Sequence, residues 1–305
     1  MINKKILIAG GTGFIGSLLT KKLIENNYKV TILSRGKSAI NNNFPKDVEI
    51  LSWNEFDETS FPQFLENFYG IINLAGASIA EKKWTKEYKE IIIKSRVVTT
   101  TKLAKAINSS TQPPQVFINA SAVGYYGNSG ENEVTEESNS GNDFLSEVCK
   151  LWESSALIAK NSTRVVLGRI GVVLDKNEGA LKKMIEPYKF FAGGPLGSGK
   201  QWIPWIHYTD LINLFIFSLE DENISGAINY VSPEPVRMNE FASALGKVMK
   251  KPSLMRVPEF SLKLLMGEAS AIVLNSCRAL PQKAIKNSFD FKYKKIQEAL
   301  MSLID

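Results

Sequence analysis

Three glycines near the N-terminus, Gly10, Gly13 and Gly16, have the spacing of a phosphate-binding turn. They follow the apolar run 4–9, typical of a buried strand, and lead into an amphipathic helix expected over 14–24. Glycine suits this turn because the backbone bends sharply and approaches a ligand more closely than a Cβ would permit. Since the free N–H groups at a helix start attract anions, we expect a diphosphate here.

The end of the second expected strand, 29–33, bears on which dinucleotide carries that diphosphate. NAD-binding proteins place an acid about 20 residues beyond the glycines, whereas an arginine accommodates the 2′-phosphate of NADP. Here the segment 33–37 holds Ser34 and Arg35 and no carboxylate. A hydroxyl beside a guanidinium suits a phosphate, so we predict NADP. The alternative is that Arg35 only caps a solvated loop.

Composition restricts the class of protein. The 305 residues, 44% of them hydrophobic, suffice for one large domain and a smaller one. The net charge of +6 comes from scattered lysine pairs, so we expect solvated helix faces and no nucleic-acid partner. Two cysteines and one histidine predict neither a disulfide framework nor a metal site. With no long apolar stretch and no room for a signal peptide, we expect a cytoplasmic protein without a membrane partner.

Strand-like and helix-like segments alternate through the first two thirds of the chain. Apolar strands are expected at 4–9, 29–33, 48–51, 70–75, 115–120, 164–169 and 226–231, with long helices at 85–108 and 143–159. This alternation predicts an α/β fold of Rossmann type, a doubly wound parallel sheet with a smaller C-terminal substrate lobe. Ligands of such sheets bind at the carboxyl ends of the strands.

The regular alternation of strands and helices ends at about residue 179. A glycine-rich loop at 193–199 and an aromatic stretch at 202–205 precede helices expected at 239–250 and 260–266. We therefore predict an NADP-binding domain over 1–232, with an insertion at about 179–204 that contributes to the substrate lobe. The C-terminal lobe is expected over 233–305.

Several motifs together resemble a known family. Segments 10–16, 73–76 and 121–127 are similar to the extended short-chain dehydrogenase/reductases of the NAD(P)-dependent epimerase/dehydratase family. Segments 84–96, 193–200, 204–210 and 278–281 resemble its atypical branch, the "epimerase family protein" branch with a C-terminal domain of unknown function.

The resemblance implies which residues contact NADP. They gather at the glycine turn and at the carboxyl ends of the following strands: Gly10, Thr12, Gly13, Phe14, Ile15, Gly16, Ser34, Arg35, Asn73, Leu74, Ala75, Arg96, Ser121, Gly171 and Val172. Arg96 has an alternative reading as a helix-surface cation.

The family's usual catalytic pair is absent from this chain. Ordinary members use a serine and a Tyr-x-x-x-Lys pair on one helix, where the lysine lowers the pKa of the tyrosine. None of the nine tyrosines is followed four residues later by lysine. Matching Glu153 to the family's glutamate places Leu145 and Cys149 at the tyrosine and lysine positions. At the serine position stands Ala122, with Ser121 one place earlier.

Other residues are candidates for the missing roles. Tyr125, Tyr126 and Ser121 follow the fifth strand near the expected nicotinamide, and the alternative for the tyrosines is aromatic packing. Candidate substrate-binding residues are Gly194, Lys200, Gln201, Trp202 and His207. Lys200 and Gln201 suit a phosphate or carboxylate, whereas the stretch around His207 also resembles a helix anchor, and Trp202 would serve equally for ring stacking or core filling.

Nucleoside triphosphate hydrolysis is a competing chemistry, and Gln201 argues against it. Segment 194–201 nearly matches a P-loop, but Gln201 stands where a Ser or Thr must bind Mg²⁺. Two functions remain. The protein is an NADP-dependent epimerase or oxidoreductase acting on a small, sugar-like or anionic substrate, or it is a non-catalytic NADP-binding sensor or regulatory protein. Substrate identity and oligomeric state stay open.

Overall fold

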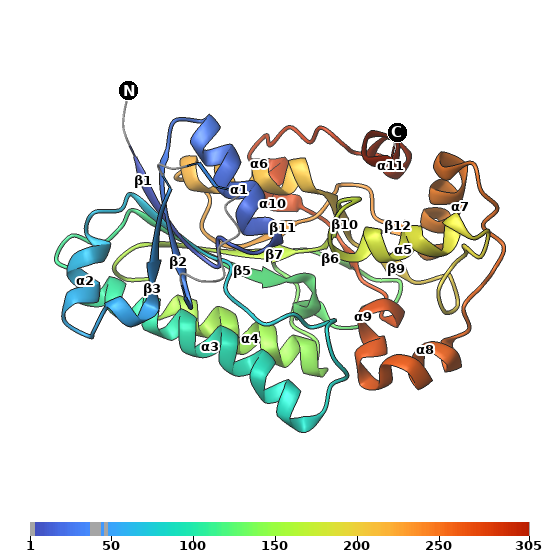
Figure 1. The fold of residues 1–305 in the computed structure, drawn as a ribbon, viewed down its shortest axis with the longest axis horizontal. Helices are drawn as coiled ribbons and strands as arrows, with labels where there is room; N and C mark the ends of the chain where they lie inside the picture. Colours follow the sequence, from blue (N-terminus) through green and yellow to red (C-terminus); the bar gives the residue numbers. More distant parts are fainter. Residues whose placement is uncertain (1–3, 37–43, 46–47, 305) are drawn as a thin grey trace.

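A seven-stranded parallel sheet occupies the centre of the computed structural model, which describes residues 4–36, 44–45 and 48–304 (Figure 1). From edge to edge the strands are β11 (Gly226–Tyr230), β7 (Arg164–Ile170), β5 (Val116–Ala122), β4 (Gly70–Asn73), β1 (Lys5–Ala9), β2 (Lys29–Ser34) and β3 (Glu49–Ser52). The strand order reverses between β1 and β4, and open α/β sheets bind their ligands at that point.

Helices cover both faces of this sheet. On one face lie α1 (Phe14–Glu25), α6 (Tyr208–Glu220) and α10 (Gln282–Lys286), and on the other α2 (Ser60–Leu65), α3 (Lys86–Ser109) and α4 (Phe144–Leu157) (Figure 1). Within β1, Ile6 and Ile8 pack toward α1 and α6, whereas Leu7 and Ala9 pack toward α3 and α4. Both sides of each central strand are therefore apolar, which is why the strands read as continuous hydrophobic runs.

A smaller lobe combines the inserted and the C-terminal segments. Its helices are α5 (Gly179–Lys189), α7 (Met238–Met249), α8 (Glu259–Met266), α9 (Ala271–Leu274) and α11 (Ile296–Ile304). Leu181, Trp205, Phe241 and Leu300 share its hydrophobic core. Trp205 is fully buried, so this aromatic residue fills the core.

Short elements join the lobe to the sheet. Strand β8 (Val172–Leu174) pairs with β10 (Trp205–His207), β9 (Trp202–Ile203) with β12 (Val236–Arg237), and β6 (Glu133–Val134) with β13 (Arg278–Ala279). The 3₁₀ helices are η2 (Trp53–Glu55), η3 (Val123–Tyr126) and η4 (Gly267–Ser270). Because α10 packs against β11 of the large sheet before α11 returns to α7 in the lobe, the chain crosses between the two parts more than once.

The predicted fold class is confirmed, and the two long helices begin close to their expected starts. Thr85 and Asp143 accept hydrogen bonds from the first turns of α3 and α4, and such caps set helix starts locally. The domain boundary at 232/233 stays a prediction. No helix in the described part of the chain combines the length and apolar character needed to span a bilayer.

Candidate functional site

Two of the three glycines at the first turn are required by the chain's own packing. Gly10 has φ +80°, and a Cβ there would lie 2.9 Å from the backbone nitrogen of Ala75. A Cβ on Gly16 would overlap the carbonyl oxygen of Gly10. These positions need glycine so that β1, α1 and the end of β4 can approach one another.

Gly13 differs, because nothing inside the described structure demands glycine there. Its φ of −78° is ordinary, and a Cβ would meet only the Gly10 carbonyl oxygen at 3.5 Å. Gly13 is also the N-cap of α1, where no side chain caps the helix and no acid occupies the first turn. An approaching anion explains both features, so the turn fits a diphosphate held by the α1 amides.

At the end of β2, Ser34 has an internal hydrogen bond whereas Arg35 faces solvent. The Ser34 hydroxyl donates to the Gly36 carbonyl at 3.0 Å and shapes the turn. Arg35 is exposed, so its guanidinium is open to a ligand from solvent. Lys37, the last residue of this predicted motif, lies outside the described residues.

The Asn73 side chain, expected to contact the cofactor, makes its hydrogen bonds within the protein. Its amide nitrogen donates to Thr100 Oγ1 at 2.8 Å and to Asn119 Oδ1 at 2.7 Å, and its oxygen accepts from the Ala75 amide at 3.2 Å. The side chain is fully buried. Asn73 therefore shapes the loop after β4, and the loop backbone at Leu74 and Ala75 is left for a ligand.

Arg96 lies inward on α3, contrary to the alternative of a solvated cation. Its Nη1 donates to the Ala77 carbonyl at 3.0 Å and the Ile92 carbonyl at 3.1 Å, and its Cζ is 4.9 Å from the centre of the Trp152 ring. Burial lowers the pKa of the guanidinium. Among the described residues Arg96 pairs with no carboxylate, so this largely desolvated cation is suited to a ligand oxygen.

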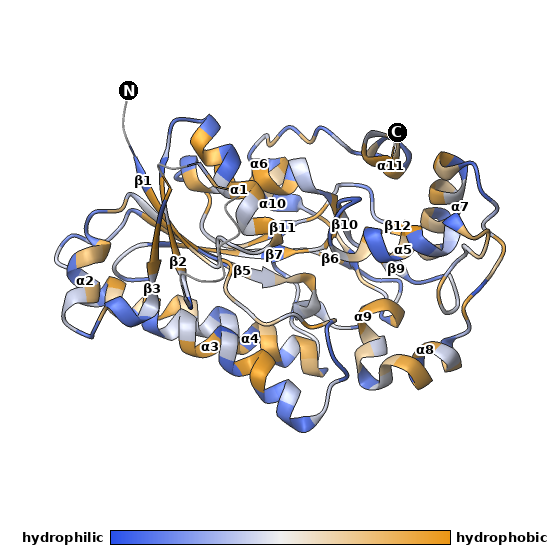
Figure 2. Cartoon of the chain, viewed as in Figure 1, coloured by the Kyte–Doolittle hydropathy of each residue, from blue (hydrophilic) through white to orange (hydrophobic). Residues whose placement is uncertain are grey.

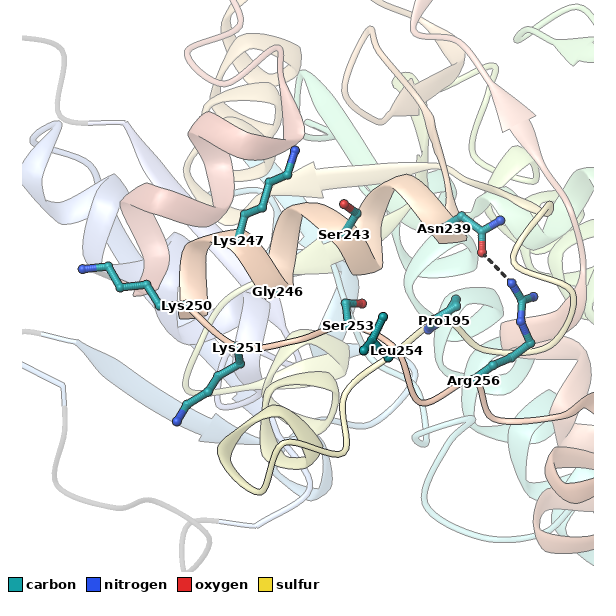
Figure 3. A pocket seen from close by; sticks show the side chains of 10 residues that line it. All are labelled: Pro195, Asn239, Ser243, Gly246, Lys247, Lys250, Lys251, Ser253, Leu254 and Arg256. Atoms are coloured by element: carbon teal, nitrogen blue, oxygen red, sulfur yellow. Dashed lines mark hydrogen bonds between the residues drawn. The ribbon is translucent and has the colours of Figure 1, made fainter.

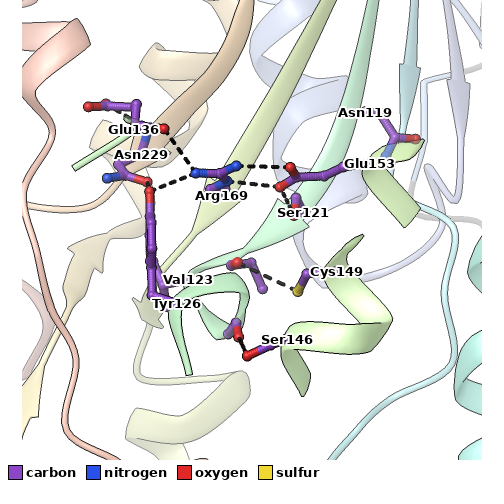
Figure 4. Close-up of polar contacts among 12 residues, drawn as sticks. Asn119, Ser121, Val123, Tyr126, Glu136, Ser146, Cys149, Glu153, Arg169 and Asn229 are labelled. Atoms are coloured by element: carbon purple, nitrogen blue, oxygen red, sulfur yellow. Dashed lines mark hydrogen bonds and ion pairs between the residues drawn. The ribbon is translucent and has the colours of Figure 1, made fainter. Parts of the chain in front are cut away.

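Ser121 belongs to a buried network at the carboxyl end of β5 (Figure 4). Arg169 binds Glu153 with two hydrogen bonds, Nε to Oε1 at 2.9 Å and Nη2 to Oε2 at 3.0 Å, and both side chains are under a tenth exposed. The Ser121 hydroxyl donates to the same Oε1 at 2.7 Å. Since its proton is committed, Ser121 can offer a ligand only acceptor lone pairs.

The two neighbouring tyrosines have different environments. The Tyr126 hydroxyl donates to Asn229 Oδ1 at 2.7 Å and accepts from Arg169 Nη1 at 3.0 Å, and burial raises its pKa. Tyr125 is partly exposed and the centre of its ring lies 3.5 Å from Arg169 Cζ. Its hydroxyl has no hydrogen bond within the described chain, so Tyr125 alone of the pair is available to a substrate.

The helix position of the family's missing pair is apolar. Leu145 Cβ and Cys149 Sγ would lie 3.2 and 3.8 Å from a Cβ on Gly124, in the turn that follows β5. The Cys149 thiol points at the Ala122 carbonyl at 3.6 Å, and burial raises its pKa to about 12. Neither residue can transfer a proton near neutral pH.

Two predicted substrate residues have structural partners. Gln201 is buried and its Nε2 donates to the carbonyls of Leu196 and Val273 at 3.0 and 3.1 Å. A Cβ on Gly194 would overlap the Met255 carbonyl oxygen. Gln201 and Gly194 therefore hold the glycine loop in place, and their contact with a substrate stays a prediction.

His207, another predicted substrate residue, has a structural role at the start of α6. It is the N-cap of α6, with Nδ1 accepting from the Thr209 amide at 3.0 Å, and its ring centre lies 3.9 Å from that of the tilted Tyr293 ring. Burial and the nearby Lys292 lower its pKa to about 4. His207 is therefore a buried, neutral capping residue, and its contact with a substrate stays a prediction.

The remaining predicted residues lie in or next to the glycine loop and the short strands that join the lobe to the sheet. Lys200 is exposed, and Trp202 donates its Nε1 to Glu131 at 3.2 Å between the guanidiniums of Arg237 and Arg278. Gly171 is required because a Cβ would overlap the Pro204 carbonyl, which accepts from the Val172 amide at 2.7 Å. Among the residues that the structure describes, no cluster of metal-ligating side chains occurs.

Sequence reasoning missed the Arg169–Glu153 pair. The available signal was a charged residue inside an otherwise apolar expected strand, since a buried charge requires a partner. The partners of Tyr126 gave no such signal, because Asn229 lies 103 positions further along the chain.

The fold and the glycine turn define a dinucleotide-binding α/β protein of Rossmann type. The chain belongs to the NAD dependent epimerase/dehydratase family, whose model matches residues 6–230. A second model, a domain of unknown function (DUF1731), matches residues 257–303.

Several relatives extend over nearly the whole chain. The Arabidopsis thaliana chloroplastic homolog of epimerase family protein SDR39U1 is 42% identical over 98% of this chain and 86% of its own. Epimerase family protein SAR0825 of Staphylococcus aureus is 38% identical over 99% of both chains. The crystal structure of human epimerase family protein SDR39U1 with NADPH superposes with a TM-score of 0.90, at 30% identity over 98% of this chain and 99% of that chain.

The buried ion pair yields the first testable prediction. Glu153→Gln leaves the Arg169 guanidinium without a compensating charge, so the free energy of unfolding should fall by about 3–5 kcal/mol in urea denaturation. The matched control Glu131→Gln alters an exposed pair with Arg237 and should change stability little. Equal losses for both variants would contradict the importance assigned to burial.

Proposed function

We propose that this protein binds NADP(H) and uses it on a small substrate, as an epimerase or oxidoreductase. The uncapped α1 N-terminus at Gly13 is the observation that carries the proposal, because it is a site for an anion that the chain itself does not fill. Exposed Arg35 lies at the end of the adjacent strand β2, where it suits the 2′-phosphate of NADP. The NADPH in the human relative supports the same cofactor.

Arg96 is proposed as the cation that this chain provides in place of the family's lysine. Cys149 occupies the lysine position on α4 and its thiol is neutral. Trp152 lies three residues after Cys149 on the same helix, and the Arg96 guanidinium of α3 stacks on its ring. The guanidinium has donors beyond those used by Ala77 and Ile92. These donors suit the ribose or phosphate oxygens of the cofactor.

Tyr125 is proposed as the acid/base. Bound NADP(H) supplies a hydride acceptor or donor, and a protein group must then hold or release the hydroxyl proton at the substrate oxygen. Tyr126 is excluded by its two internal hydrogen bonds, whereas the Tyr125 Oη is available. The Arg169 guanidinium lies over the Tyr125 ring, with Cζ 3.5 Å from the ring centre, and this contact holds the ring in position at the end of β5.

A second function fits the apolar Leu145–Cys149 face of α4. Without a lysine beside a tyrosine, the protein would bind NADP and act as a sensor or regulatory protein. The substrate and the cytoplasmic location stay predictions.

The cofactor assignment is tested by titration. Wild-type protein should bind NADPH more tightly than NADH, and Arg35→Gln should weaken NADPH about tenfold or more through loss of charge-assisted bonds while leaving NADH nearly unchanged. Lys29→Gln, at the far end of β2, is the matched control. Tighter binding of NADH than NADPH by the wild type would contradict the assignment.

The role of Arg96 is tested by moving the positive charge. Arg96→Gln should lower NADPH affinity about tenfold, whereas Lys94→Gln, an exposed neighbour paired with Glu90, should not. Introducing Cys149→Lys into the Arg96→Gln protein should recover part of the lost affinity. An unchanged affinity in Arg96→Gln would refute this role.

Turnover separates the two functions. We expect NADPH oxidation or NADP reduction with a member of a panel of carbonyls, alcohols and nucleotide sugars, and Tyr125→Phe should slow it about a hundredfold at unchanged NADPH affinity. Tyr126→Phe should instead cost about 1–3 kcal/mol of stability, because Asn229 and Arg169 lose a partner. Tight NADPH binding without turnover on any compound would favour the sensor.

A further inference from the structure

Large apolar side chains are exposed along one end of the smaller lobe. This apolar edge consists of Phe190, Phe191, Leu254, Met255, Phe260, Leu264 and Leu265. Leu254 is 83% exposed and Leu264 77% exposed, far more than core packing would leave. Monomeric soluble proteins rarely leave such apolar groups together in water, so the edge is a candidate interaction surface.

Direct contacts join two parts of the apolar edge. The Met255 amide donates to the Gly193 carbonyl at 3.0 Å, and Lys251 Nζ lies 3.7 Å from the centre of the Phe191 ring. The end of α5 and the segment after α7 are therefore side by side. Helix α8 follows directly at the same end of the molecule, where Figure 2 shows it largely hydrophobic.

Helix α8 turns only one side inward. Leu262 is buried, whereas Phe260, Leu264 and Leu265 are all more than two thirds exposed. Phe260 and Leu264, four residues apart, share one helix face, and Leu265 lies at the edge of that face. No segment of the described chain covers that face.

Cations border the apolar edge. Lys247, Lys250, Lys251 and Arg256 line an open groove of about 630 Å³ that also includes Leu254. In Figure 3 the three lysines extend outward in different directions and do not converge on a common point. No carboxylate lines this groove, and none of these lysines forms an ion pair with a described residue.

The exposed apolar side chains and the lysines beside them together indicate the kind of partner. Diverging lysines do not enclose a small anion, and a second copy of this chain docked through the same surface would bring like charges together. A lipid surface accommodates both features, since apolar side chains enter the acyl boundary while lysines stay among anionic headgroups. We infer that the apolar edge docks this protein on the surface of a membrane that contains anionic lipids, without spanning it.

The inference is tested with the full-length protein and lipid vesicles. Sedimentation should show binding to vesicles of phosphatidylcholine mixed with phosphatidylglycerol and much less to phosphatidylcholine alone. Phe260→Ser/Leu264→Ser should reduce the bound fraction about tenfold or more, as should Lys247→Gln/Lys251→Gln. The matched controls on α3 and α4, Ile91→Ser/Val98→Ser and Lys105→Gln/Lys150→Gln, should bind as the wild type does.

Unchanged NADPH affinity and thermal unfolding would show that the variants are folded. Absence of vesicle binding, or equal binding by the Phe260→Ser/Leu264→Ser protein, would overturn the inference. Light scattering provides a separate check without lipid. A wild-type dimer that Phe260→Ser/Leu264→Ser converts to a monomer would identify a second copy as the occupant and would also overturn it.

Discussion

The ion pair between Arg169 and Glu153 is the interaction on which the carboxyl end of the sheet depends. It joins β7 to α4, and through Ser121 and Tyr126 it also holds β5 and η3. Two charges buried this deeply are stable only while each compensates the other and their remaining hydrogen-bonding atoms are satisfied. The network therefore keeps the strand ends in one arrangement around the expected nicotinamide position.

That network also limits the chemistry available to the site. Ser121 and Tyr126 resemble catalytic groups in the sequence, yet their hydroxyl protons are committed to Glu153 and Asn229. Leu145 and Cys149 make the facing side of α4 apolar. The proton-handling and cationic roles consequently move to Tyr125 and Arg96, which come from different elements from those of the family's usual pair.

Much of the cofactor region was predictable because its signals are local. The run 4–9, the glycines and the following helix lie within about 20 residues, and the N-caps Thr85 and Asp143 act within three residues of their own positions. The substrate side was less predictable. Gln201 and His207 had suitable chemistry for a ligand, but Val273 and Tyr293, which come from the C-terminal region, give them structural roles.

The sequence by itself determined the parallel sheet, the phosphate-binding turn and the absence of the Tyr-x-x-x-Lys pair, because each depends on residue types at short, fixed spacings. Only the tertiary structure decided which tyrosine keeps a free hydroxyl, that Arg96 lies inward, and that α8 leaves one face uncovered. Those outcomes depend on which distant segments meet, and a side chain's burial and hydrogen bonds do not exist until the fold brings those segments together.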